Sequence, residues 1–191
     1  NEIAKNIVIS NLICIIEKSF ELWKMYCDQE ISQNNSMNKN LIECWMHRGI
    51  FYYMVARDVF SNKGDRHRYF NAAYNYLYEA HSLAVNSGKH ESHSPWFVPF
   101  LLGKLCLKLR EKDFTEALAY FKMALKETDH NYTRTQSSSK SGGDMKLEQW
   151  LLATHHLHAT RAKILLKCSE AGKKICIKIL QEFPFRKDSK V

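Results

Sequence analysis

Apolar residues return every three or four positions along most of the chain, which is the spacing of one face of an α-helix. Only seven Gly and three Pro occur in 191 residues, so long stretches contain no helix breaker. The pattern predicts an all-α protein of about seven helices. These cover approximately residues 3–30, 41–60, 67–86, 95–109, 113–130, 147–168 and 171–183.

Turn-forming residues separate the predicted helices. Asn62, Lys63 and Gly64 are expected to end the second helix. The fourth contains Pro99, so either its regular part starts near this residue or its first turn is distorted. Residues 131–146 are rich in Ser, Gly and Lys without an apolar period, and they predict a flexible loop.

Small residues indicate where helices touch, because a closely packed pair needs Gly or Ala at its crossing and large apolar residues beside it. Tetratricopeptide repeats have this pattern. Two irregular copies occur here: Trp45, Gly49 and Tyr52 before Ala73, Leu77 and Ala80, and Leu102 and Gly103 before Ala117, Phe121 and Ala124. A third unit over residues 147–183 has only Trp150 and Ala171 as landmarks. We expect a single domain over residues 1–191, an α-solenoid of irregular tetratricopeptide-like helix pairs.

Two runs resemble a known family. WFVPFLLGKLCLKL, from Trp96 to Leu109, and LHATRAKILLK, from Leu157 to Lys167, are similar in order and separation to two helices of the calcineurin-binding protein cabin/Hir histone chaperone subunit family. The resemblance covers about residues 94–168 and rests on helical packing positions. It implies a tetratricopeptide scaffold that binds other subunits of a nuclear complex. That complex deposits histones independently of replication. The calcineurin-docking part of the family lies in another region.

Cysteine usage and hydropathy indicate an intracellular protein. The apolar residues 7–16 are too few for a membrane span and predict a core helix segment. No signal leader precedes them and the chain begins at Asn1, which indicates a fragment of a longer protein. Six cysteines without a C-x-x-C pair predict buried, reduced thiols: Cys14, Cys27, Cys44, Cys106, Cys168 and Cys176.

Positive charge accumulates toward the C-terminal end. The formal net charge is +8, and after residue 160 nine basic residues face three acidic ones. Lys163 and Lys167 lie one helical turn apart, as do Lys174 and Lys178 in the next predicted helix, so each pair should project from a common face. These four lysines are our candidate partner-binding residues. Such a face steers acidic protein partners, and nucleic-acid binding through the same basic end is the alternative.

No pattern in the chain predicts catalysis, and we expect no cofactor and no small-molecule substrate. His155, His156 and His158 invite a zinc interpretation, but only the first and third share a helix face, and no Cys or acidic residue lies at a ligand spacing. We therefore expect no metal. P-loop, nucleophile-elbow and zinc-protease motifs do not occur in the sequence. Most tryptophans fall on apolar stripes, which favours core packing over base stacking. The sequence thus predicts a protein-interaction scaffold.

Overall fold

The computed structural model describes residues 2–34, 39–86, 96–109, 114–140 and 147–182. All regular structure in these ranges is α-helical, which confirms the predicted all-α class. The chain forms two compact units, residues 1–92 (unit 1) and residues 93–191 (unit 2). The expectation of one continuous solenoid domain stays a prediction.

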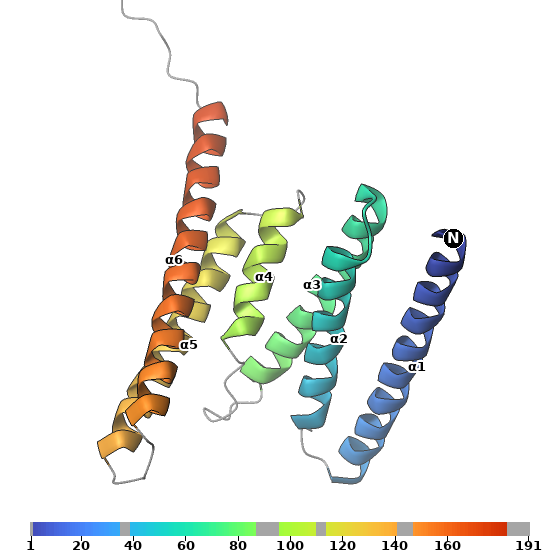
Figure 1. The fold of residues 1–191 in the computed structure, drawn as a ribbon, viewed down its shortest axis with the longest axis horizontal. Coiled ribbons are helices and arrows are strands. Elements are labelled where there is room, and N and C mark those ends of the chain that lie inside the picture. The colour runs from blue at the N-terminus through green and yellow to red at the C-terminus, as the bar shows by residue number, and fades with distance from the viewer. Residues whose placement is uncertain (1, 35–38, 87–95, 110–113, 141–146, 183–191) are drawn as a thin grey trace, which may run out of the picture. The chain divides into compact units, whose positions relative to one another are not determined.

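Unit 1 contains three helices, of which successive ones run in opposite directions (Figure 1): α1 (Glu2–Asn34), α2 (Lys39–Asp58) and α3 (Lys63–Asn86). Gly49 lies where α2 crosses α3. A Cβ atom at this position would be 2.6 Å from Leu77 Cγ and 3.0 Å from the Leu77 backbone nitrogen. Ala73, Leu77 and Ala80 of α3 are all buried. The pairing of small and large residues predicted for this helix pair is confirmed.

The turn between α2 and α3 provides the N-cap of α3. Asn62 Oδ1 accepts a hydrogen bond from the backbone N–H of Asp65 at 2.7 Å, which is the bond of an N-cap residue. Lys63 and Gly64 then form the first turn of α3. The expectation that these residues end α2 is wrong, because Asn serves at either end of a helix and here it caps the following one.

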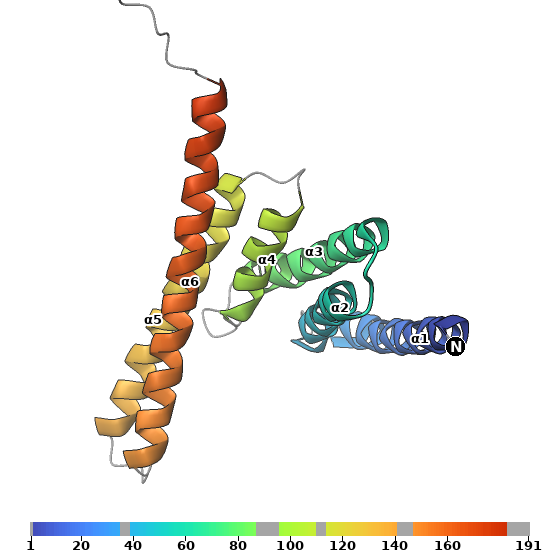
Figure 2. The same cartoon turned by 45° about the horizontal axis from the view of Figure 1, so that its top comes forward.

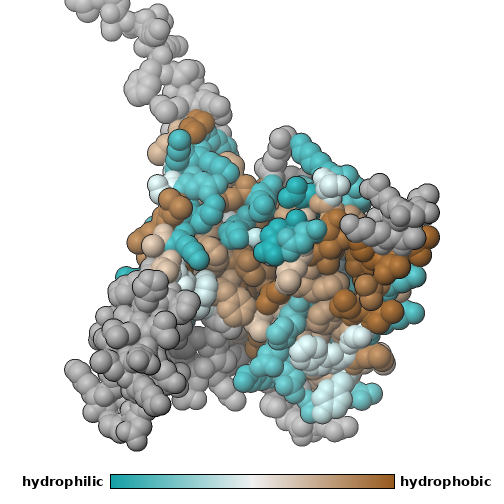
Figure 3. All heavy atoms as spheres, viewed as in Figure 1, coloured by the Kyte–Doolittle hydropathy of each residue, from teal (hydrophilic) through white to brown (hydrophobic). Residues whose placement is uncertain are grey.

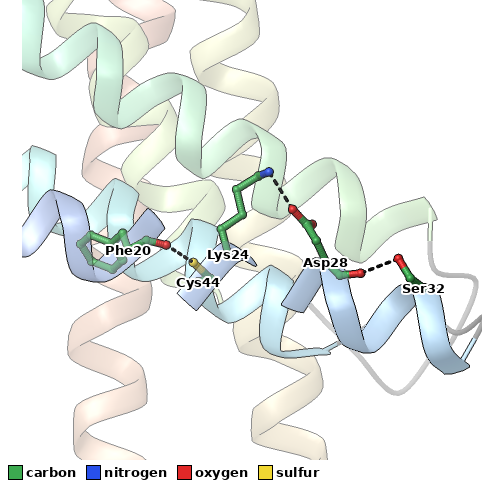
Figure 4. A network of polar contacts seen from close by, with 5 residues as sticks. All are labelled: Phe20, Lys24, Asp28, Ser32 and Cys44. Atoms are coloured by element: carbon green, nitrogen blue, oxygen red, sulfur yellow. Dashed lines mark hydrogen bonds and ion pairs between the residues drawn. The ribbon is translucent and has the colours of Figure 1, made fainter. Parts of the chain in front are cut away.

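Residues 7–16 were expected in the core, and this prediction is wrong for most of them. Helix α1 packs on α2 through contacts such as Phe20 with Phe51, whose ring centroids are 6.0 Å apart. The thiol of Cys44 in α2 donates to the carbonyl oxygen of Phe20 at 3.7 Å (Figure 4). Of the apolar residues in 7–16, only Ile13 is buried. Ile9 and Ile16 are half-buried, and the others are exposed because apolar residues occur on more than one side of α1.

Unit 2 also contains three helices: α4 (Phe97–Lys108), α5 (Phe114–Lys140) and α6 (Leu147–Glu182). Gly103 of α4 faces Phe121 of α5, and a Cβ atom at this glycine would be 2.5 Å from Phe121 Cε1. Ala117 and Ala124 are fully buried, so the predicted crossing is confirmed. Pro99 is the third residue of α4, where its missing N–H would have no partner within the helix. The first of the two alternatives for this proline is therefore correct.

Two helix ends in unit 2 differ from prediction. Helix α5 continues to Lys140, so the loop expectation is wrong for residues 131–140, whereas residues 141–146 lie outside the described part. No Gly or Pro occurs within α5, so neither of the two strongest helix breakers stops it. Helix α6 runs unbroken from Leu147 to Glu182, where two helices were predicted. The described residues therefore form six helices and not about seven.

Candidate functional site

The unbroken helix α6 places the four candidate lysines on one face. Lys163, Lys167, Lys174 and Lys178 follow one another at spacings of four, seven and four residues, which a helix brings to the same side. At a rise of 1.5 Å per residue they extend over about 22 Å. We call these four residues the lysine stripe. The sequence predicted two separate pairs, and the continuity of α6 joins them.

Glu170 lies at the centre of the lysine stripe. Its carboxylate is 2.5 Å from the Lys167 ammonium through Oε2 and 3.6 Å from the Lys174 ammonium through Oε1. The hydrogen bond from Lys167, together with the charges of Lys167 and Lys174, holds the pKa of the Glu170 carboxyl below its ordinary value. Glu170 therefore stays ionised, and it offsets one of the four positive charges while it orients the two central lysines.

Helix α5 holds the lysine stripe in place. Ile164 and Ala171 of α6 are fully buried, and α5 and α6 lie side by side in both views (Figure 1 and Figure 2). The Lys174 ammonium lies 5.4 Å from the ring centroid of Phe114 in α5, within the range of a cation–π contact. Lys167 and Lys174 are half-buried, whereas Lys163 and Lys178 are exposed. The stripe thus borders the buried seam of α6 and is supported by a packed helix.

The net positive charge of the chain belongs to unit 2. Unit 1 has ten basic and ten acidic side chains, whereas unit 2 has eighteen basic and ten acidic ones. Long-range attraction of an anionic partner depends on such an excess, and a neutral unit contributes little to it. The whole of the formal charge of +8 therefore acts around the unit that carries the lysine stripe.

The histidines and cysteines were the other candidates for chemistry that the sequence offered. The side chains of His155, His156 and His158 lie outside the described part, so the expectation for these residues stays a prediction. Within the part that is described, no group of three metal-ligating side chains comes together. The six cysteines are not joined by disulfides, but Cys14 and Cys176 are exposed, so the expectation that all of them are buried is wrong. Among the described helices, none covers the sides of α1 and α6 on which these two residues lie.

A cluster that the sequence analysis missed joins the three helices of unit 1. The Tyr52 hydroxyl of α2 donates to Glu17 Oε1 of α1 at 2.5 Å, and the Tyr52 ring stacks on Tyr76 of α3 at 5.2 Å. Burial and the hydrogen bond to Glu17 raise the pKa of the Tyr52 phenol. Arg48 is 9% exposed and its guanidinium lies 4.5 Å from the Tyr76 ring centroid. The signal available in the sequence was Arg48, a charged residue one helical turn before Tyr52.

This cluster stabilises the unit. Arg48 Nε has no hydrogen-bond partner, and the face of Tyr76 takes the place of an anion beside the guanidinium. Further ring contacts extend the cluster, including Trp45 with Tyr76 at 5.4 Å. Packed aromatic pairs of this kind stabilise a fold beyond their buried area. The lysine stripe therefore remains the candidate functional site.

Comparison of the chain with protein-family models, with curated proteins and with solved structures gave no match. The resemblance of residues 94–168 to the cabin/Hir family accordingly stays a prediction. Within the described ranges, no helix is both long enough and apolar enough to cross a lipid bilayer.

Proposed function

We propose that this chain is a protein-interaction scaffold whose lysine stripe binds an acidic segment of a protein partner. The observation that carries the proposal is the single face of α6 that presents Lys163, Lys167, Lys174 and Lys178 over about 22 Å. A rigid helix positions these charges without the entropy cost of ordering a loop. An extended or helical acidic segment of similar length has a complementary spacing of charges.

The alternative function is nucleic-acid binding, and the charge excess of unit 2 favours it. Proteins that bind single strands combine such charge with exposed aromatic rings on which bases stack. Among the side chains described in unit 2, every aromatic residue is buried or half-buried. Phe121 is fully buried. We therefore favour a protein partner.

The resemblance to the cabin/Hir family makes the proposal more specific. On this resemblance we propose that the chain belongs to a nuclear histone chaperone complex that assembles chromatin independently of replication. Histones are themselves basic, so a lysine stripe repels them and suits an acidic surface of another subunit. The scaffold role accordingly concerns assembly of the complex, with histone binding left to other subunits.

Binding of fluorescent poly-L-glutamate and of a short DNA duplex over a series of salt concentrations tests the proposal. We expect poly-L-glutamate to bind more tightly than the duplex at every salt concentration. A duplex that binds more tightly, with a steep fall in log K against log salt, would support nucleic-acid binding instead. Failure of both probes to bind at low salt would remove the lysine stripe from the function.

A further inference from the structure

Helix α1 carries a row of large apolar side chains that face solvent. Five of them are between 52% and 66% exposed, and Figure 3 shows apolar residues gathered over the part of unit 1 where α1 lies. Their spacing alternates between three and four residues if Ser19 is counted among them, which is the a/d repeat of a coiled coil. We call these positions the α1 seam: Val8, Leu12, Ile15, Ser19, Leu22 and Tyr26.

The α1 seam is distinct from the side of α1 that packs on α2. The side facing α2 contains Ile13 and Cys27, which are buried, and Phe20 and Trp23, which are half-buried. Position 12 is rotated about 100° from position 13 around the helix axis, as is position 26 from position 27. A helix that is apolar on two sides normally has both of them covered. The seam therefore requires a second partner helix.

We propose that the α1 seam binds the same seam of a second copy of this chain, with the two α1 helices antiparallel. Reversal of the seam about residue 17 superimposes it on itself: position 8 lies opposite 26, position 12 opposite 22, and position 15 opposite 19. Leu12 then packs on Leu22, and Ile15 fills the space beside the small Ser19. A parallel pair would instead place Ser19 on Ser19 and leave a gap in the centre of the interface.

Ser19 is compatible with an apolar interface. Its hydroxyl donates to the backbone carbonyl oxygen of Ile15 in its own helix at 3.0 Å, so it enters the interface with its donor satisfied. One charged residue, Lys18, borders the seam close to the two-fold axis in both copies. Its long side chain can carry the ammonium to solvent. The residual repulsion between the two Lys18 side chains predicts a dimer that strengthens with salt.

The exposed apolar area is adequate for such a dimer. Met25 and Ile7, which flank the seam, are 58% and 56% exposed. Together with the seam they offer an apolar surface of several hundred Å² per copy, which is large for a patch on a monomer. Two such surfaces approach the lower end of the roughly 1,200–2,000 Å² that a specific interface buries. This inference concerns unit 1 and is independent of the lysine stripe in unit 2.

Sedimentation velocity of the full chain over a concentration series tests the self-association. We expect a monomer–dimer equilibrium whose dissociation constant rises about tenfold or more in Leu12→Glu, because a charge replaces a seam residue. Val85→Glu is the matched control, since Val85 is 65% exposed on α3 and lies off the seam. Far-UV circular dichroism verifies that both variants keep their helical content. A chain that is monomeric at all concentrations, or equal weakening by both variants, would overturn the proposal.

Disulfide trapping tests the antiparallel direction. The variants Leu12→Cys and Leu22→Cys are prepared with Cys14, Cys168 and Cys176 replaced by Ser, because these native thiols are not buried. We expect little covalent dimer from either variant alone and abundant dimer from their mixture, since position 12 lies opposite position 22. Dimers that form equally from each variant alone would contradict the antiparallel arrangement.

Discussion

Replacement of Gly103 by Ala should destabilise unit 2, although the same change stabilises most helices. The new Cβ atom would lie 2.5, 2.7 and 2.9 Å from Cε1, Cδ1 and Cζ of Phe121. Carbon atoms pack at about 3.5–4.0 Å, so the ring or the helix must move by about 1 Å. The Phe121 ring is fully buried and its centroid lies 5.9 Å from that of Phe100, so a movement of the ring disturbs packed neighbours.

The two opposing effects can be compared in magnitude. Overpacking of a core costs about 1–3 kcal/mol, whereas Gly to Ala inside a helix contributes about 1 kcal/mol of helix propensity. We expect the steric cost to win, with a net loss of about 1 kcal/mol in the free energy of unfolding. Gly172→Ala is the matched control, because a Cβ atom there meets nothing within 4 Å. That variant should gain stability.

Urea unfolding followed by circular dichroism measures both variants. The reasoning predicts opposite signs for Gly103→Ala and Gly172→Ala in the same chain. Phe121→Leu in the Gly103→Ala background should recover part of the loss, because the smaller side chain leaves room for the methyl group. Equal stabilisation by the two alanine substitutions would refute the close approach of α4 and α5.

Three further predictions test other parts of the structure. Ala124→Arg should lower the free energy of unfolding by about 3 kcal/mol or more through overpacking and a buried charge, measured by urea unfolding. Tyr52→Phe should remove the hydrogen bond to Glu17 and about 1–2 kcal/mol of stability. Because the fold raises the pKa of the Tyr52 phenol, this stabilisation is fully present below pH 10 and is lost as the pH rises above it. The free energy of unfolding should therefore fall less at alkaline pH in the variant than in the wild type. Glu170→Gln should speed association with poly-L-glutamate in stopped-flow measurements more than Glu79→Gln does, since Glu170 pairs with Lys167 and Lys174 of the lysine stripe whereas Glu79 belongs to unit 1.

The helix crossings were the most predictable feature of the sequence. Gly49 with Leu77 and Gly103 with Phe121 satisfy a local rule, because close approach requires a small residue on one helix and a large one on the other. The same rule identified Ala124 as a crossing residue, and it is fully buried. Periodicity and side-chain size, both visible in the sequence, were sufficient for these pairs.

Helix ends and exposed faces were not predictable in the same way. A helix ends where a capping or breaking residue outweighs continued hydrogen bonding, and Ser-rich composition alone did not stop α5 before Lys140. Helix α6 continues past Ser169, and Glu170 pairs with lysines on both sides of the expected break. The exposure of Leu12 depends on which helices surround α1, and a single sequence does not show this. Consequently, the common face of the four lysines was not foreseen, and their role in partner binding stays a prediction.

The central claim is that the position of the positive charge, and not its amount, controls association with an acidic partner. Charge reversal of the lysine stripe to Glu changes the net charge as much as reversal of four other lysines of unit 2: Lys104, Lys108, Lys122 and Lys126.

Stopped-flow association of poly-L-glutamate with the wild type and these two variants, at low and high salt, tests the claim most directly. All three proteins should keep the same helical content. We predict that the stripe variant associates much more slowly than the off-stripe variant at low salt, and that the difference shrinks at high salt because screening weakens steering. Equal association rates for the two variants at low salt would contradict the account and remove the lysine stripe as a binding surface.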